Sequence, residues 1–247
     1  LIMMSNHLEE MVSSGRVTGR NPCIVLDSGH GGEDPGKIGV NQAKEKDVNL
    51  KIAKKTKERL EKKGWKVVMT REKDVMLGDP AAGNKKIHDM KARVERINKT
   101  MPQAAVSIHQ NSYHEESVSG GQVFYYKTSV RGKKLAQILQ ERFDYVLGDA
   151  NKRQAKANDN YYLLLHVKEP IIIAECGFLS NWEEAEKLET KEYQDRLAWT
   201  IHVGIMEFLN QKKSSTPEHI KDKGIYIAGD LAETLRYLKE NIVGKEM

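Results

Sequence analysis

The sequence has few cysteines, no membrane-spanning hydrophobic run and only a small excess of positive charge. Its two cysteines, Cys23 and Cys176, cannot form a framework of disulfides, and both stand in apolar runs that are typical of buried thiols. No hydrophobic run reaches the length needed to cross a bilayer, so we expect no transmembrane span. The net charge of +5 is spread along the chain, so it does not indicate a nucleic-acid partner and suits an anionic wall or membrane surface equally well.

What the sequence does contain is the composition of a globular domain. Hydrophobic residues make up 39% and charged residues 30% of the 247 residues, which is enough apolar material for a core. We expect an N-terminal arm over 1–20, a main body over 21–211, and a linker with a C-terminal helical extension over 212–247. The chain begins "LIMM" rather than with a lone initiator Met, so we also expect that an export signal or anchor is missing from this sequence.

Segments with the pattern of strands alternate with segments with the pattern of amphipathic helices along the main body. The expected strands cover 23–27, 65–70, 104–110, 120–126 and 170–178, with 161–166 as either a strand or an exposed apolar lip. The expected helices cover 45–64, 87–100, 132–147, 181–190, 191–210 and 228–241, and loops cover 71–86 and 150–160. This alternation predicts a layered α/β domain with a largely parallel sheet.

Three of the expected strands carry or lead into a polar residue that does not suit a core. His30 follows the first strand inside the glycine-rich stretch "DSGHGGEDPG", His109 ends the strand "AAVSIHQ", and Glu175 follows apolar residues in "PIIIAECGF". Ligands of open α/β sheets bind at the carboxyl ends of the strands, so these side chains predict a metal or acid–base site there. The stretch "GHGGEDPG" fits neither the Walker pattern nor G-x-G-x-x-G, which argues against a phosphate-binding loop.

Zinc suits this set of side chains, because a catalytic zinc takes three ligands from histidine and carboxylate and keeps one position open. His30 and His109 would supply two of the ligands. The third has several candidates, which are Glu33, Asp34, Glu45, His114 and Glu175. Glu45 is favoured because it begins a helix directly after the glycine-rich loop, which can fold back and set it beside His30. A carboxylate at Glu175 is costly to bury without a partner or a function.

The motifs as a set resemble those of a known enzyme family. In order along the chain they are "IVLDSGHGGEDPGKIG", "EKDVNL", "TR", "VSIHQNS", "GGQVFYY" and "PIIIAECGFLSN", which together span about residues 21–209. This resembles the zinc-dependent N-acetylmuramoyl-L-alanine amidases of the Amidase_3 family, and more closely their sporulation and germination members, the CwlD type. The resemblance implies an α/β fold with a twisted, mostly parallel sheet of about six strands and helices on both faces.

Carried over to this sequence, the resemblance implies one zinc ion held by His30, Glu45 and His109, with Glu175 as the catalytic general base and acid. The implied reaction is hydrolysis of the amide between N-acetylmuramic acid and L-alanine in peptidoglycan, in the maturation of spore cortex. Three further residues are weaker candidates: Asp27 to orient a ligand, and Arg93 and Asn111 to contact the substrate or the ligands.

The wall substrate suggests a place of action, and the lack of a visible wall-binding domain suggests a partner. We expect the protein to act outside the cytoplasm, in the cell wall or the space between the forespore membranes, with a lipoprotein as an activating or localising partner. Two rival functions remain at this point. One is a zinc carboxypeptidase-like peptidase acting on wall peptides, and the other is a wall-binding module with a vestigial site.

Overall fold

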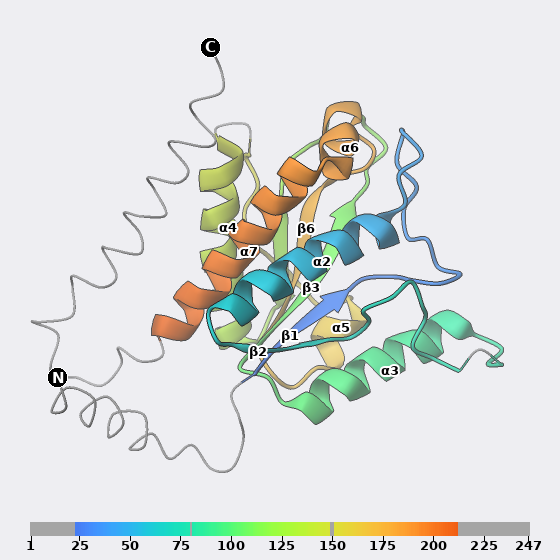
Figure 1. The fold of residues 1–247 in the computed structure, drawn as a ribbon, viewed down its shortest axis with the longest axis vertical. Coiled ribbons are helices and arrows are strands. Elements are labelled where there is room, and N and C mark those ends of the chain that lie inside the picture. Colours follow the sequence, from blue (N-terminus) through green and yellow to red (C-terminus); the bar gives the residue numbers. More distant parts are fainter. Residues whose placement is uncertain (1–22, 80, 149–150, 212–247) are drawn as a thin grey trace, which may run out of the picture. The chain divides into compact units, whose positions relative to one another are not determined.

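The structure is a computed structural model, and it describes residues 23–79, 81–148 and 151–211 (Figure 1). The expected N-terminal arm over 1–20 and the expected extension over 212–247, with its helix over 228–241, lie outside the described residues. The chain divides into two units at Phe208, and all described residues except the last three of the final helix belong to the first unit. Within the described ranges, every helix is too short or too polar to serve as a membrane span.

The described residues form six strands and six helices. The strands are β1 (Cys23–Ser28), β2 (Lys66–Met69), β3 (Ala104–Asn111), β4 (Gln122–Tyr126), β5 (Lys156–Asn158) and β6 (Ile171–Phe178). The helices are α2 (Glu45–Lys62), α3 (Lys85–Thr100), α4 (Val130–Leu147), α5 (Tyr162–His166), α6 (Trp182–Glu189) and α7 (Lys191–Gln211). Strands and helices alternate, which confirms the predicted α/β class.

The strands form one sheet in the order β2-β1-β3-β6-β4-β5. All neighbouring pairs are parallel except β4 and β6, which run antiparallel. The three strands at the centre, β1, β3 and β6, are buried along almost their whole length, as expected for parallel strands covered on both faces. Their carboxyl ends meet at one edge of the sheet, where the sequence places its polar side chains.

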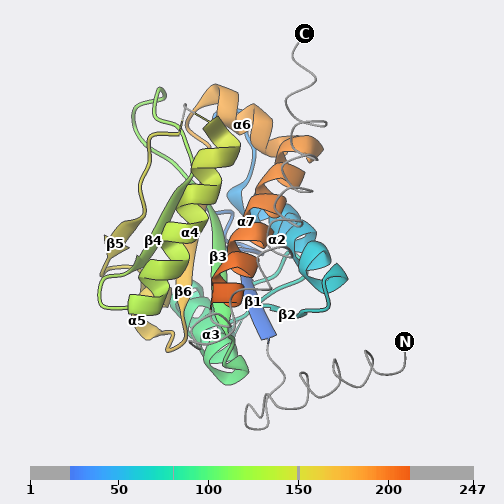
Figure 2. The same ribbon diagram turned by 90° about the vertical axis from the view of Figure 1, so that its left-hand side faces the viewer.

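Helices cover both faces of the sheet, as predicted (Figures 1 and 2). Helices α3 and α5 pack on one face, where Val25, Ala105 and Ile173 join Ile97 and Leu163 in a buried cluster. Helices α2, α4 and α7 lie on the other face. Because side chains alternate along a strand, residues that share parity with Val25, Ala105 and Ile173 point towards α3 and α5. This parity decides which strand-end residues can meet.

Two expectations about the loops and short elements were wrong. The segment 161–166 contains the helix α5 rather than a strand or a lip, and its adjacent residues Leu163 and Leu164 are both buried. Periodicity cannot distinguish a helix from a strand in so short an apolar run. The expected loop 150–160 contains the strand β5, whose backbone pairs with β4 at the sheet edge although two of its three side chains, Lys156 and Asn158, are polar.

Helix α3 also begins earlier than the apolar pattern indicates. The side chain of Asn84 accepts a hydrogen bond from the backbone N–H of Ile87, so Asn84 caps the helix and Lys85 is its first residue. Helix α6 begins after the expected cap, Asn181, whose side chain accepts from the N–H of Glu184. The cap at Asn84 fixes the start of the helix that covers one side of the site described next.

Candidate metal centre

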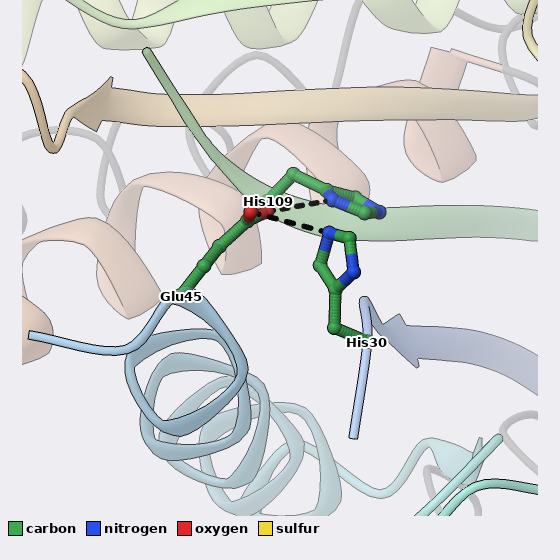
Figure 3. Close-up of side chains that lie close together, drawn as sticks. All are labelled: His30, Glu45 and His109. Atoms are coloured by element: carbon green, nitrogen blue, oxygen red, sulfur yellow. Dashed lines mark hydrogen bonds and ion pairs between the residues drawn. The ribbon is translucent and has the colours of Figure 1, made fainter. Parts of the chain in front are cut away.

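His30, Glu45 and His109 lie together at the carboxyl edge of the sheet (Figure 3). Each offers one ligand atom, and these three atoms lie within 4.8 Å of one another. Nδ1 of His109 is 2.9 Å from Oε1 of Glu45, and Nε2 of His30 is 3.2 Å from Oε2 of the same carboxylate. The two imidazole rings meet edge to face, with centroids 5.0 Å apart. This is a set of two nitrogens and a carboxylate that could hold a metal ion.

The chain between β1 and α2 folds back on itself and returns Glu45 to the edge of the sheet. Ile38 and Lys44 form an isolated antiparallel bridge, so the segment before α2 runs beside the segment that follows the glycines. The backbone N–H of Glu45 donates to the carbonyl of Lys37, and the N–H of Lys37 donates to Oε2 of Glu45. Glu45 is therefore held at both its backbone and its carboxylate.

Backbone geometry around His30 explains the need for glycine. His30 itself has φ 62°, which is unusual for a residue with a side chain, and such strain is common at functional sites. Gly36 has φ 69°, and a Cβ at this position would lie 2.5 Å from Oε2 of Glu45 and 2.7 Å from the His30 ring. The loop therefore needs glycine at position 36, because any side chain there would occupy the space of the cluster.

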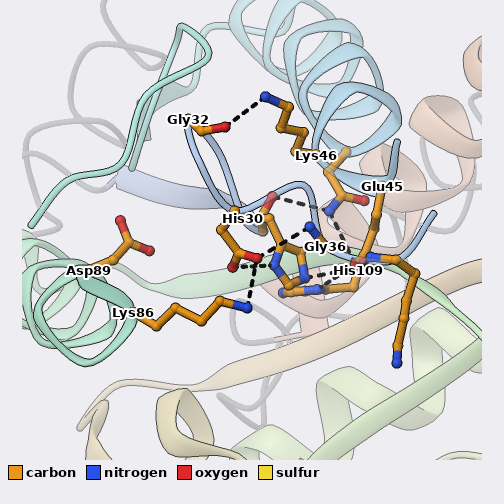
Figure 4. A network of polar contacts seen from close by, with 12 residues as sticks. His30, Gly32, Gly36, Glu45, Lys46, Lys86, Asp89 and His109 are labelled. Atoms are coloured by element: carbon orange, nitrogen blue, oxygen red, sulfur yellow. Dashed lines mark hydrogen bonds and ion pairs between the residues drawn. The ribbon is translucent and has the colours of Figure 1, made fainter. Parts of the chain in front are cut away.

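Asp34 holds the other nitrogen of His30. Figure 4 shows His30, Glu45 and Lys86 in the network of polar contacts around this histidine. Its Oδ2 lies 2.8 Å from Nδ1 of His30, and its Oδ1 lies 2.9 Å from Nζ of Lys86 on α3. Histidine ligands of metals commonly donate their second ring N–H to a carboxylate, which sets the tautomer and the ring orientation. From the sequence, Asp34 was predicted only as a candidate ligand. Its spacing of four residues from His30 inside a tight loop was the signal for this orienting role.

Glu45 is also held by groups outside the cluster. The backbone N–H of Gln110 donates to Oε1 at 3.2 Å, and the amide of Asn49 lies 3.4 Å from the same oxygen. Asn49 is one turn further along α2 and is fully buried, and its amide also donates to the carbonyl of Gly29. These contacts join α2, β3 and the start of the glycine-rich loop. Asn49 and Gln110 were not among the site residues predicted from the sequence.

The cluster shifts the pKa values of its own members. Burial alone raises the pKa of Glu45, but hydrogen bonds and charge from His109 and His30 outweigh it, so this pKa lies well below its ordinary range. Burial alone lowers the pKa of His109, but the Glu45 carboxylate outweighs burial and raises this pKa to about 9. Glu45 is therefore ionised in the metal-free protein, and it holds a proton on His109 near neutral pH.

Glu175 stands beside His109. The two residues are partners in the register of β3 and β6, so their side chains leave the same face of the sheet. Burial raises the pKa of Glu175 to about 7, and the charge of Glu45 adds to the rise while His109 opposes it. Its buried Oε2 makes no hydrogen bond within the described part of the chain. Glu175 and the three clustered residues line one open cavity of about 490 Å³.

Asp27 and Arg93 support the site from beneath. Asp27 is fully buried, accepts hydrogen bonds from the hydroxyls of Thr70 and Ser107, and pairs with Arg93 at 2.7 Å. Arg93 in turn donates to the backbone carbonyl of His30 at 2.6 Å. Within the described part of the chain, Asp27 makes no hydrogen bond to the side chain of a clustered histidine. It fixes Arg93, which fixes the backbone of His30.

The remaining candidates lie apart from the cluster. The side chain of Glu33 is exposed and pairs with Lys85. His114 is also exposed, and it lies near Glu115. The structure therefore brings neither Glu33 nor His114 to the cluster. Asn111 lines the cavity at the end of β3.

Comparison with known proteins identifies the family. Residues 24–207 match the family described as N-acetylmuramoyl-L-alanine amidase (Amidase_3), a match that covers well over half of the chain. The chain belongs to this family. It is therefore a hydrolase of the class that cleaves the amide between N-acetylmuramic acid and L-alanine, and the resemblance predicted from the motifs is confirmed.

Individual relatives agree with this assignment. The amidase is 36% identical over 192 residues to the germination-specific N-acetylmuramoyl-L-alanine amidase of Bacillus subtilis (strain 168), which covers 76% of this chain and 80% of the relative. It is 29% identical over 187 residues to the N-acetylmuramoyl-L-alanine amidase LytC of the same organism. This aligned region covers 75% of this chain but only 35% of LytC.

Solved structures share the fold of this amidase. The CwlD amidase from Clostridioides difficile, in complex with the GerS lipoprotein, matches with a TM-score of 0.74 and 37% identity over 77% of this chain and 100% of that chain. The catalytic domain of CwlV from Bacillus (Paenibacillus) polymyxa var. colistinus matches with a TM-score of 0.67 and 28% identity, over 76% of this chain and 98% of that chain. The sheet with helices on both faces is thus the fold of these amidases.

Proposed function

We propose that this amidase is zinc-dependent, with one zinc ion held by His30, Glu45 and His109 and with Glu175 as general base and acid. The observation that carries the proposal is the geometry of one cavity edge. Three ligand atoms from the loop after β1, from α2 and from β3 lie within 4.8 Å of one another, and Glu175 is the register partner of His109.

The residues fit zinc in kind and in surroundings. Two imidazole nitrogens and one carboxylate oxygen are a ligand set that catalytic zinc sites use. Asp34 and Gln110 hold the outer sides of His30 and Glu45, as second contacts of metal ligands commonly do. Gly36 leaves free the space that a side chain would occupy.

Glu175 carries the proton transfer. When bound, zinc supplies a Lewis acid that polarises the amide carbonyl and makes water acidic enough to lose a proton near neutral pH. Glu175 accepts that proton at its buried Oε2, which has no hydrogen-bond donor among the described residues. It then returns the proton to the leaving amine of L-alanine as the amide C–N bond breaks. Its raised pKa of about 7 suits a group that must both take and give a proton.

The test is a pair of substitutions with different expected losses. Glu175→Gln keeps bound zinc and loses turnover, whereas His109→Ala loses both. Metal content by mass spectrometry and release of peptide from peptidoglycan are measured on the same preparations, with His114→Gln as the control that retains both. Hydrolysis by purified Glu175→Gln at the wild-type rate would overturn the role of Glu175.

The bond that is cleaved separates this proposal from a carboxypeptidase-like peptidase. Digestion of intact muropeptides by the amidase releases peptides that begin with a free N-terminal L-alanine and leaves bare muramic acid. A peptidase leaves L-alanine attached to muramic acid and trims the peptide from its other end. Mass spectrometry of the products decides between the two.

We further propose a role in the maturation of spore cortex, where removal of the peptide precedes formation of muramic-δ-lactam. The support is the 36% identity to a relative named germination-specific. Spores of the source organism that lack this protein are then expected to lack muramic-δ-lactam. Normal lactam content in such spores would exclude this role.

A lipoprotein is the partner that we propose, with peptidoglycan as the substrate and a site of action outside the cytoplasm. The support is the CwlD neighbour, whose solved structure contains the GerS lipoprotein. Co-purification from sporulating cells tests the partner, and recovery of the chain alone in repeated experiments would count against it.

We also propose residues 21–211 as the catalytic domain, in keeping with the family match over 24–207.

A further inference from the structure

The cavity beside the cluster is lined by more carboxylates than cations. Its acidic side chains are Asp27, Asp34, Glu45, Asp89 and Glu175, and its basic side chains besides the histidines are Lys37, Lys86 and Arg93. The proposed zinc ion would offset part of this negative charge. A negative group of the substrate that lies away from the metal still needs a cation that is not already paired with a carboxylate.

Two of the three cations are already paired. The guanidinium of Arg93 is buried and binds both Asp27 and Asp89 at 2.7 and 2.6 Å. The ammonium of Lys86 lies 2.9 Å from Asp34. Lys37 differs from both, because its ammonium forms no ion pair or hydrogen bond within residues 23–79, 81–148 and 151–211.

Lys37 is also fixed close to the reacting groups. Its backbone N–H donates to Oε2 of Glu45 at 2.8 Å, and its carbonyl accepts from the backbone N–H of Glu45 at 2.9 Å. These two hydrogen bonds to Glu45, a proposed metal ligand, fix the position of the Cα atom of Lys37. The side chain of Lys37 is exposed at the cavity wall. An exposed lysine on a flexible loop would have no such fixed place.

We propose that Lys37 binds a carboxylate on the peptide part of the substrate, next to the scissile amide, and so makes the enzyme prefer acidic stem peptides. This rests on the proposed amidase function of the same site. The chemistry of the substrate indicates that the bound carboxylate lies on the peptide and not on the glycan. The carboxyl group of N-acetylmuramic acid is consumed in the scissile amide, so the N-acetylated glycan is uncharged and acid groups occur only on the peptide. The unpaired ammonium of Lys37 attracts such a group directly, at a place on the cavity wall where the other cations are already paired with carboxylates.

The test uses two peptidoglycan fragments of equal glycan length. They differ only in the residue after L-alanine, whose α-carboxyl group is free in one fragment and a carboxamide in the other. Wild-type enzyme is expected to have the higher kcat/KM for the acid. Lys37→Gln lowers kcat/KM for the acid by about fivefold, the upper range for a solvent-exposed ion pair, and leaves the amide unchanged. Lys37→Glu reverses the preference. Lys51→Gln, at an exposed lysine of α2 outside the cavity, changes neither value.

The outcomes separate this inference from the proposed function. An equal fall of kcat/KM on both fragments in Lys37→Gln, or no fall on either, overturns the role of Lys37 while the amidase function stands. If the wild-type enzyme with zinc cleaves neither fragment, the proposed function fails and this inference fails with it. The preference for the acid is also expected to shrink as salt is added, because ions screen an exposed pair.

Discussion

Asp34 Oδ2 lies 2.8 Å from Nδ1 of His30, on the side of the ring opposite to Glu45. The contact turns Nε2 towards the carboxylate of Glu45, where the proposed metal would lie. Lys86 holds Asp34 from the other side. The charge on Asp34 is stable, because hydrogen bonds and charge from His30 and Lys86 outweigh burial and lower its pKa.

Loss of the Asp34 carboxylate is expected to weaken zinc binding. Asp34→Asn removes the charge that orients His30, and substitutions of this kind cost about 10- to 100-fold in metal affinity. Competition with a chelating dye measures the dissociation constant. Glu33→Gln is the matched control, because the adjacent Glu33 is exposed and pairs only with Lys85. Equal affinities of Asp34→Asn and wild type would contradict an orienting role.

Gly36→Ala is expected to damage the site as well as the fold. A Cβ there would lie 2.5 Å from Oε2 of Glu45, so the carboxylate must shift. Gly64→Ala is the control for backbone strain alone, since Gly64 has φ 82° and a Cβ there would meet nothing within 4 Å. The control costs about 1 kcal/mol of stability and keeps zinc affinity, while Gly36→Ala loses more of both. Thermal unfolding and zinc titration measure the two effects. Equal losses in both variants would show that the space beside Glu45 is not needed.

The metal-free protein is expected to lose stability as pH rises through the titration of Glu175. The pKa rises from 4.5 to about 7 on folding, mainly because the carboxyl is buried. The folded state therefore binds the proton more tightly, and the stabilisation present below about pH 4.5 is lost as pH rises through about 7. Glu175→Gln removes this loss. With a chelator present, its gain in unfolding free energy over wild type is about 3 kcal/mol at pH 8 and near zero at pH 4. A gain that does not depend on pH would contradict the burial effect.

Zinc affinity is expected to rise with pH in the neutral range. The pKa of His109 is raised from 6.5 to about 9 in the metal-free protein, so zinc must displace a proton from its ring. The apparent affinity therefore rises about tenfold per pH unit below about pH 9. Zinc titrations at pH 6, 7 and 8 measure this slope, and proton release measured by calorimetry in two buffers checks it. His114→Gln, which removes an exposed histidine outside the cluster, leaves the slope unchanged. A flat profile would show that His109 is already neutral at pH 6.

Local patterns in the sequence were sufficient for most elements and for the residues of the cluster. The apolar runs predicted the central strands, and the motifs predicted the set of His30, Glu45 and His109 that the structure brings together. Short or polar segments were not predictable in the same way. The helix α5 and the strand β5 owe their form to neighbours, because Leu163 packs into the core and Lys156–Asn158 pairs with β4.

The sequence by itself determined which chemistry is available and at which strand ends it appears. Because side chains alternate along a strand, the sequence already assigns His109 to one face of β3 and Glu175 to one face of β6. Only the tertiary structure decided that these faces coincide, that Arg93 reaches both Asp27 and the backbone of His30, and that Lys37 alone among the cavity cations of the described chain lacks an acidic partner. These relationships join residues through strand register, helix docking and the return of a loop, which no local periodicity encodes.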